Sequence, residues 1–172
     1  MPATNQAASQ ASKSKRTAKA NDAVALLIAD HKAVKAMFDE YEELGDRATV
    51  SKKKLATQIC LELTKHAIAE EEIFYPAVRN EAEEGEDMVD EATVEHASAK
   101  DLIAQIMSME PSDDLYDAKV KVLGEYIDHH VKEEEEEMFP KARDTDLDLV
   151  AMADAIQARK DQITLADIEL PA

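Results

Sequence analysis

A histidine followed by a glutamate four residues later and a proline ten residues later occurs twice in this chain. The first copy is His66-Ala-Ile-Ala-Glu70 with Pro76, and the second is His130-Val-Lys-Glu-Glu134 with Pro140. Imidazole nitrogen and carboxylate oxygen, with no thiolate beside them, are ligands suited to iron-class ions. The spacing therefore indicates a metal site that is built twice from the same parts.

A further histidine precedes each copy and completes the repeat. His31 lies 35 residues before His66, and His96 lies 34 residues before His130. The chain is thus one unit written twice, and the two units together supply enough ligands to hold two ions between four helices. The predicted metal ligands are His31, His66, Glu70, His96, His130 and Glu134.

Helix geometry explains why the histidine and the glutamate of each motif are four residues apart. Residues at this spacing lie one turn apart on nearly the same stripe of a helix. The stripe is also apolar, with Leu63 one turn before His66 and Ile127 one turn before His130. We therefore expect these side chains to project into the bundle, where a cation offsets the cost of a buried carboxylate.

The repeat also predicts how the ligands divide between two ions. We expect His31 with His66 on one ion and His96 with His130 on the other, with the two glutamates bridging the pair. Such an arrangement leaves positions open for water, oxo or a small ligand. The predicted cofactor is a pair of iron ions, oxo- or hydroxo-bridged, with manganese or zinc as alternatives. A metal-free bundle whose histidines serve packing is the competing interpretation.

Four further polar residues lie close to the motifs in the sequence. His129 is interpreted as peripheral, because the register of the repeat selects His130. Glu137 lies two turns after His130 and is a candidate contact of the site. Tyr126 and Glu62 each lie one turn before a predicted ligand and are candidates for hydrogen bonds to it.

Apolar residues at helical spacing predict four long helices and a shorter last one. The first helix begins at Asn21 or Asp22 and stops at Gly45, and the second is kinked or ended by Pro76. An acidic turn at 84–87 starts the third helix. Segment 111–113 breaks that helix and caps the fourth, and an amphipathic segment over 147–163 packs across one end.

Short connections between long helices favour antiparallel neighbours. The predicted fold is an all-α, up-down-up-down four-helix bundle over residues 21–172. Residues 1–20 contain four basic residues and no acidic one, and we expect a disordered basic tail there.

Composition and charge exclude several classes of partner. The first 20 residues carry +4, so the rest of the chain must carry −22 to give the net charge of −18, which disfavours nucleic acid. The apolar run at 23–29 is too short for a membrane span. A single cysteine, Cys60, rules out an internal disulfide and favours a reducing compartment, so we expect a cytoplasmic protein.

These residues resemble the hemerythrin-like, HHE cation-binding family. The resemblance covers about residues 22–163, and it implies a four-helix di-iron bundle whose iron ligands are the six residues named above. It is weaker toward the invertebrate oxygen carriers, which have a histidine where this chain has Lys100 and a bridging aspartate one position after Glu134. The ligand set is closer to bacterial di-iron proteins proposed to repair nitrosative damage to iron–sulfur clusters.

The function expected from the site and the resemblance is binding of, or reaction with, dioxygen, nitric oxide or peroxide in oxidative or nitrosative stress. The main alternative is an iron donor or buffer serving apo iron–sulfur proteins. Turnover would require an electron-donor protein, because the sequence shows no flavin motif. The sequence leaves open whether the protein is an enzyme.

Overall fold

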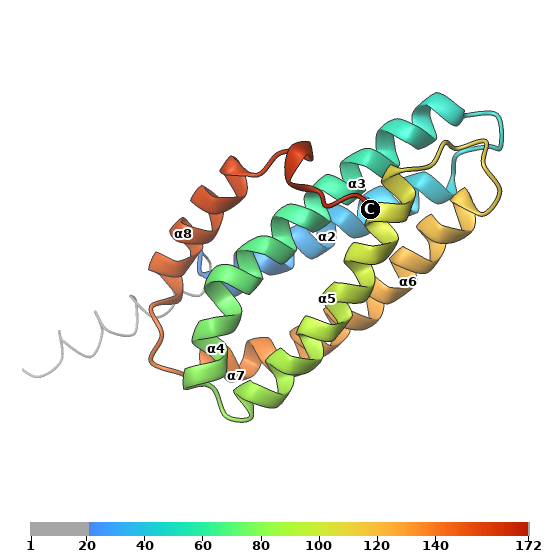
Figure 1. Ribbon diagram of the computed structural model, residues 1–172. Helices are drawn as coiled ribbons and strands as arrows, with labels where there is room; N and C mark the ends of the chain where they lie inside the picture. Colours follow the sequence, from blue (N-terminus) through green and yellow to red (C-terminus); the bar gives the residue numbers. More distant parts are fainter. Residues whose placement is uncertain (1–20, 172) are drawn as a thin grey trace, which may run out of the picture.

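The computed structural model describes residues 21–171, so the expected tail at 1–20 lies outside the described residues. Residues 21–171 form helices and connections and contain no strand, which confirms the all-α prediction (Figure 1). The long helices are α2 (Ala23–Glu42), α3 (Thr49–Ala69), α5 (Gly85–Met107) and α6 (Tyr116–Glu133). The shorter elements are η1 (Glu70–Phe74), α4 (Tyr75–Glu81), η2 (Glu134–Met138), α7 (Phe139–Arg143), α8 (Leu149–Gln162) and η3 (Leu165–Asp167).

The four long helices lie side by side, and consecutive helices run in opposite directions (Figure 1). Helix α2 packs against α3 and α6, and α5 packs against the same two helices, which closes the bundle. Helix α8 packs along α2, α3 and η1 rather than across one end, so the expected placement of the last helix was wrong.

Two of the predicted helix boundaries were wrong for local reasons. Gly45 does not end the first helix in a left-handed conformation, because α2 already closes at Glu43 with ordinary right-handed backbone. Asp113 does not cap α6, because its carboxylate accepts a hydrogen bond from the backbone N–H of Glu110. Leu115 precedes α6 instead, with φ of 72°. The Asp22 cap of α2 is confirmed by its 2.8 Å bond from the Ala25 N–H.

The turn between the two halves of the bundle requires a glycine. A side chain at Gly85 would lie 2.2 Å from the Val78 carbonyl oxygen, closer than any real contact. Glu84, just before it, has φ of 57°, in the left-handed region. This tight turn lets α5 return directly along α4.

Each HxxxE motif is followed by one turn of π-helix. The backbone N–H of Tyr75 bonds to the carbonyl of Glu70, and that of Phe139 bonds to the carbonyl of Glu134, both five residues back. A proline follows each turn; it removes a backbone donor and its ring pushes away the carbonyl four residues earlier. The wider turn absorbs this, so the helix continues past the proline instead of ending there.

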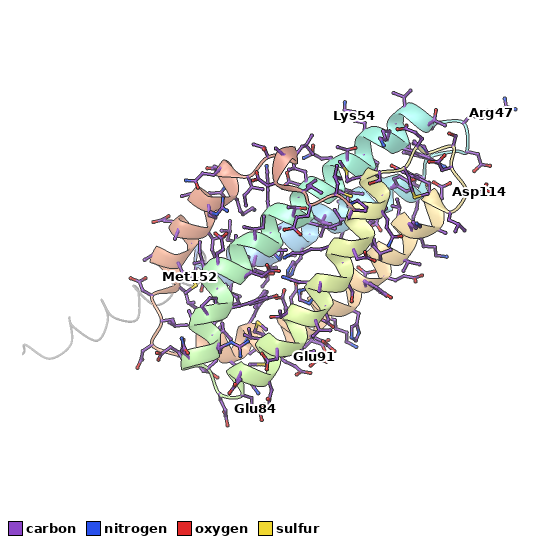
Figure 2. The ribbon with its side chains drawn as sticks, in the orientation of Figure 1. Arg47, Lys54, Glu84, Glu91, Asp114 and Met152 are labelled. Atoms are coloured by element: carbon purple, nitrogen blue, oxygen red, sulfur yellow. The ribbon has the colours of Figure 1, made fainter. Side chains whose placement is uncertain are left out.

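The core consists of two apolar clusters with a polar layer between them. One cluster lies toward the end of the bundle that carries α4 and α7, is covered on its side by α8, and includes Leu27, Phe74 and Phe139. The other includes Phe38 and Tyr116 and extends toward the opposite end. Figure 2 shows these ends, with Glu84 at one and Arg47 and Asp114 at the other. The predicted ligands occupy the layer between the clusters.

Candidate metal centre

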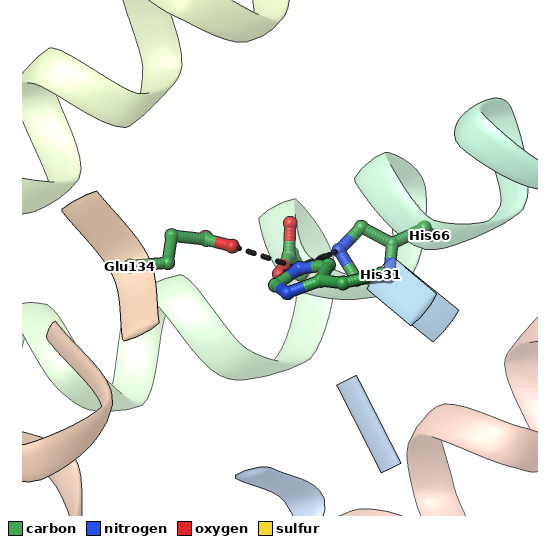
Figure 3. Close-up of side chains that lie close together, drawn as sticks. His31, His66 and Glu134 are labelled. Atoms are coloured by element: carbon green, nitrogen blue, oxygen red, sulfur yellow. Dashed lines mark hydrogen bonds and ion pairs between the residues drawn. The ribbon is translucent and has the colours of Figure 1, made fainter. Parts of the chain in front are cut away.

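All six predicted ligands meet in the middle of the bundle, and none of them is more than 7% exposed. Each of the four long helices contributes one histidine, and each π turn begins with one of the glutamates. Figure 3 shows His31, His66 and Glu134, which belong to three different helical segments, pointing toward one another. The structure therefore brings the predicted set together, and their assignment as metal ligands stays a prediction.

The histidines form two pairs, as the repeat predicted. The Nε2 atoms of His31 and His66 are 3.1 Å apart, and those of His96 and His130 are also 3.1 Å apart. Two nitrogens at this distance repel each other through their lone pairs unless a proton or a metal ion lies between them. Each pair thus has the geometry of two ligands to one ion.

Each glutamate reaches both pairs with its two carboxylate oxygens. Glu70 Oε1 lies 3.0 Å from His66 Nε2, and Glu70 Oε2 lies 3.3 Å from His96 Nε2. Glu134 makes the matching contacts, with Oε2 3.2 Å from His31 and Oε1 3.4 Å from His130. This arrangement suits two carboxylates that bridge two neighbouring cations.

Four outer carboxylates hold the imidazole rings through their Nδ1 atoms. Asp30 and Glu95, which directly precede His31 and His96, each bond the second histidine of their own half. Glu71 and Glu135, which directly follow Glu70 and Glu134, each bond the first histidine of the other half. The Nδ1 distances are His66 to Asp30 3.0 Å, His130 to Glu95 2.5 Å, His96 to Glu71 2.9 Å and His31 to Glu135 2.9 Å. With a hydrogen on Nδ1, each ring presents its Nε2 lone pair to the centre.

Two buried carboxylate oxygens indicate whether metal ions fit this site. Glu70 Oε1 and Glu134 Oε2 are fully buried, and they accept no hydrogen bond from any residue in the described part of the chain. An orphaned buried carboxylate oxygen is costly, and coordination to a cation satisfies it. Four imidazoles and two such carboxylates, with outer carboxylates fixing the rings, fit a pair of metal ions.

The charges in the site shift the pKa values of its members. Burial acts to lower the pKa of His66, but the charge of Glu70 and the hydrogen bond to Asp30 outweigh it and raise the pKa to about 10. Burial is likewise outweighed at His130, where Glu134 raises the pKa to about 9. Without metal these rings therefore hold protons at neutral pH, and metal binding must release them.

Tyr75 is a member of the site that sequence reasoning missed. Its hydroxyl donates to Glu134 Oε1 at 2.6 Å, and the hydroxyl oxygen lies 3.2 Å from Glu70 Oε2 and 3.1 Å from His96 Nε2. In an α-helix Tyr75 would lie about 140° around the axis from Glu70. The π turn reduces this offset, because its i→i+5 hydrogen bonds bring residues five apart onto the same face of the helix. The proline after each motif signals a disturbed helix but does not by itself specify a π turn.

The other candidate contacts have mixed outcomes. Tyr126 is 49% exposed and Glu62 pairs with Gln58 and Lys65 on the surface, so neither contacts the centre. His129 is peripheral, as expected, and its side chain is 65% exposed. Glu137 is exposed but lines a cavity that also reaches His130 and Glu134.

A second cavity, of about 30 Å3, lies against the histidines on the side of the other apolar cluster. All four predicted histidine ligands line it. The rest of its wall is largely aliphatic and includes Val34, Leu63, Ala99, Ile103 and Ile127. The centre thus faces a small apolar space.

Comparison with known proteins gives three results. Residues 22–142 match the hemerythrin HHE cation binding domain family. The chain is 33% identical over 114 residues to a DNA nickase of Nostoc sp., covering 66% of this chain and 31% of that protein. It is 25% identical over 112 residues to an uncharacterized hemerythrin-like protein of Schizosaccharomyces pombe, covering 64% of this chain and 54% of that protein. The chain therefore spans about a third and about half of the length of these two relatives.

A solved structure has a similar fold. The crystal structure of a hemerythrin HHE cation binding domain-containing protein from Mycobacterium kansasii superposes with a TM-score of 0.69 at 22% identity. The match covers 82% of this chain and 86% of the other. Within residues 21–171, no helix is long and apolar enough to cross a membrane. Because the family match covers most of the bundle and all six converging side chains, this chain belongs to the hemerythrin HHE cation-binding domain family.

Proposed function

We propose that this protein holds two iron ions in the centre of the bundle and uses them to bind or react with a small neutral ligand: dioxygen, nitric oxide or hydrogen peroxide. Iron is favoured over manganese or zinc because the donors are imidazoles and carboxylates without thiolate. A ferrous pair supplies electrons to such ligands when it is bound. The chain's own residues position the ions and exclude bulk water from them.

The observation that carries this proposal is the apolar cavity against the four histidines. Its volume of about 30 Å3 admits a molecule of two or three non-hydrogen atoms and excludes most metabolites. Its aliphatic wall offers few polar partners, and such cavities favour neutral ligands over ions. A purely structural metal site has no need of a space beside its ligands.

The direct test is spectroscopic. Dioxygen, nitric oxide and peroxide are added in turn to the anaerobic ferrous protein, and the charge-transfer bands of the iron are followed. We expect new bands with at least one of these ligands. A spectrum unchanged by all three would end the proposal.

A cavity-filling variant localises the effect. Ala99→Leu fills part of the cavity, whereas Ala104→Leu places the same side chain at another buried position of α5 that does not line the cavity. We expect Ala99→Leu to slow or block the ligand-induced bands while keeping its iron. Ala104→Leu controls for the general cost of a larger buried side chain.

We further propose that the physiological setting is oxidative or nitrosative stress, in which these ligands arise. Catalytic turnover would draw electrons from a separate donor protein.

A second candidate function is donation of iron to apo iron–sulfur proteins, favoured by an acidic cavity that reaches the centre. The name of the Nostoc relative suggests a third, DNA nicking, which the net charge of −18 disfavours because an acidic surface repels phosphate.

A further inference from the structure

Three donor side chains lie together on the surface beside the centre, between α5 and α6. We call Glu95, His129 and Glu133 the surface triad. His129 Nε2 is 3.1 Å from Glu133 Oε1 and 3.5 Å from Glu95 Oε1. One ligand atom from each residue lies within 4.8 Å of the others, the spacing of ligands around a single cation.

The surface triad is connected to the buried centre through one carboxylate. Glu95 Oε1 faces His129, while Glu95 Oε2 accepts the 2.5 Å hydrogen bond from His130 Nδ1. The two oxygens of Glu95 thus join an exposed histidine to a buried one. Only Glu95 would separate a cation held by the surface triad from His130, one of the predicted ligands.

A polar cavity of about 90 Å3 follows the same path inward. Glu91, Glu95, Glu133 and Glu137 line it toward the surface, and Glu91 is labelled on α5 in Figure 2. Glu134 and His130 line it at the buried end, where Glu134 is 2% exposed; Glu134 Oε1 lies 3.4 Å from His130 Nε2, and Glu134 Oε2, which accepts no hydrogen bond in the described part of the chain, lies 3.2 Å from His31 Nε2. The cavity therefore leads from accessible carboxylates to a buried carboxylate, one oxygen of which accepts no hydrogen bond in the described part of the chain.

The equivalent place in the first half of the chain shows what the surface triad lacks. Asp30 occupies the position equivalent to Glu95, and Lys160 of α8 bonds both of its oxygens, at 2.6 and 2.7 Å. Among residues 21–171, no lysine or arginine makes an ion pair with Glu95. Carboxylates gather around Glu95 instead, and like charges this close repel unless a cation lies among them.

From these contacts we propose that Glu95, His129 and Glu133 bind a divalent metal ion, Fe2+ in the loading of this protein, and pass it along the acidic cavity to the buried centre. The loading step rests on the proposed function, because it needs a centre that takes up iron. The apolar cavity on the other side of the histidines is unsuited to a hydrated dication, whose desolvation there would be costly. Cations and neutral ligands would therefore reach the centre by different routes.

The test uses the full-length metal-free protein and two probes, Mn2+ followed by electron paramagnetic resonance and anaerobic Fe2+ followed by uptake rate. We expect two tightly bound ions and a third, weaker one. In a His129→Ala/Glu133→Gln variant the third ion should be lost. Iron uptake at low Fe2+ should slow about tenfold, since a cleft lined by one charge raises association rates at least that much.

Glu136→Gln is the matched control, because it removes one carboxylate charge, as Glu133→Gln does. Glu136 is exposed and does not line the cavity. It should keep the third ion and the normal uptake rate. Retention of the third ion and of the uptake rate in the double variant would overturn the inference and leave the proposed function intact. Absence of the two tight ions, with a weak ion that still depends on the surface triad, would instead refute the iron centre and support the surface site.

Discussion

The two halves of the molecule supply the same ligands but place different aromatic rings beside them. Tyr75 and Phe139 are equivalent in the repeat, each following a π turn and preceding a proline. Tyr75 places its hydroxyl among Glu134, Glu70 and His96, whereas Phe139 stacks on His31 with ring centroids 5.7 Å apart. One pair of histidines therefore lies beside a hydrogen-bond donor and the other beside a hydrocarbon face.

The halves differ in their outer charges as well. Lys160 neutralises Asp30 in the first half, whereas the equivalent Glu95 lies in the surface triad. A duplicated ligand set is thus embedded in unequal surroundings. The two histidine pairs are therefore equivalent in residue type and unequal in their surroundings, and we expect the two predicted metal positions to differ in chemistry.

The largest effect is expected from removing the two glutamates, which both halves share. Glu70→Ala and Glu134→Ala should each lower the affinity for both ions, because each carboxylate contacts both histidine pairs. We expect a loss of at least about a hundredfold, beyond the 10–100-fold typical of outer partners. Metal analysis of the purified variants measures this. Loss of a single ion in either variant would show that the glutamate does not bridge.

The stability of the metal-free protein should depend on pH through one histidine of each half. Charge and hydrogen bonds from neighbouring carboxylates outweigh burial and raise the pKa of His66 to about 10 and of His130 to about 9. A raised histidine pKa stabilises the folded state fully below the unfolded value of about 6.5, and this stability is lost as pH rises through the folded pKa.

The free energy of unfolding should therefore fall between pH 6.5 and about 10, by on the order of 1 kcal/mol per pH unit for each group. Both rings should lose their extra proton well above pH 6.5. Denaturant unfolding and a histidine NMR titration measure the two effects. Metal-loaded protein, whose rings are already neutral, is the control and should lack this fall.

Exchanging the outer carboxylates tests the difference in charge. Asp30→Asn and Glu95→Gln should both weaken metal binding, by roughly 10–100-fold, because each frees one imidazole ring. Asp30→Asn should also cost stability, up to roughly the 3–5 kcal/mol lost when one partner of a buried ion pair is removed, because Lys160 is buried. Glu95→Gln should cost much less in thermal or denaturant unfolding. Equal losses of stability in the two variants would show that Asp30 and Glu95 do not differ in their charge surroundings.

Tyr75→Phe makes the two aromatic positions alike and should have the smallest effect. It removes the hydroxyl that donates to Glu134, which we expect to cost about 1–3 kcal/mol in the metal-free protein. Tyr116→Phe, in the other apolar cluster, is the matched control and should cost less. If both variants unfold at the same denaturant concentration, the Tyr75 hydroxyl does not stabilise the site.

Much of this arrangement could be predicted from the sequence, because helical periodicity and the repeat depend on local spacing. The ligand set, the pairing of His31 with His66 and the Asp22 cap all follow from residues close to one another or related by the repeat. Tyr75 could not be found in this way, since its direction depends on a π turn. An α-helical register instead favoured Tyr126 and Glu62, which face solvent or surface partners.

The outer carboxylates were missed for a different reason. Glu71 and Glu135 each follow a predicted ligand directly, and adjacent residues on a helix point in different directions. They reach a histidine because that histidine lies on a neighbouring helix of the other half. Such contacts depend on how the helices pack, which spacing along one helix does not reveal.

Through the hydrogen bonds between Glu71 and His96 and between Glu135 and His31, each half orients a histidine ring of the other half. A fragment that ends near Glu81 carries His31 but lacks the carboxylate that orients it, and the remaining fragment has the same defect at His96. Neither fragment contains the complete surroundings of one ion. At the predicted metal centre, oriented ligands for both ions would therefore be present only when the two hairpins are docked against each other.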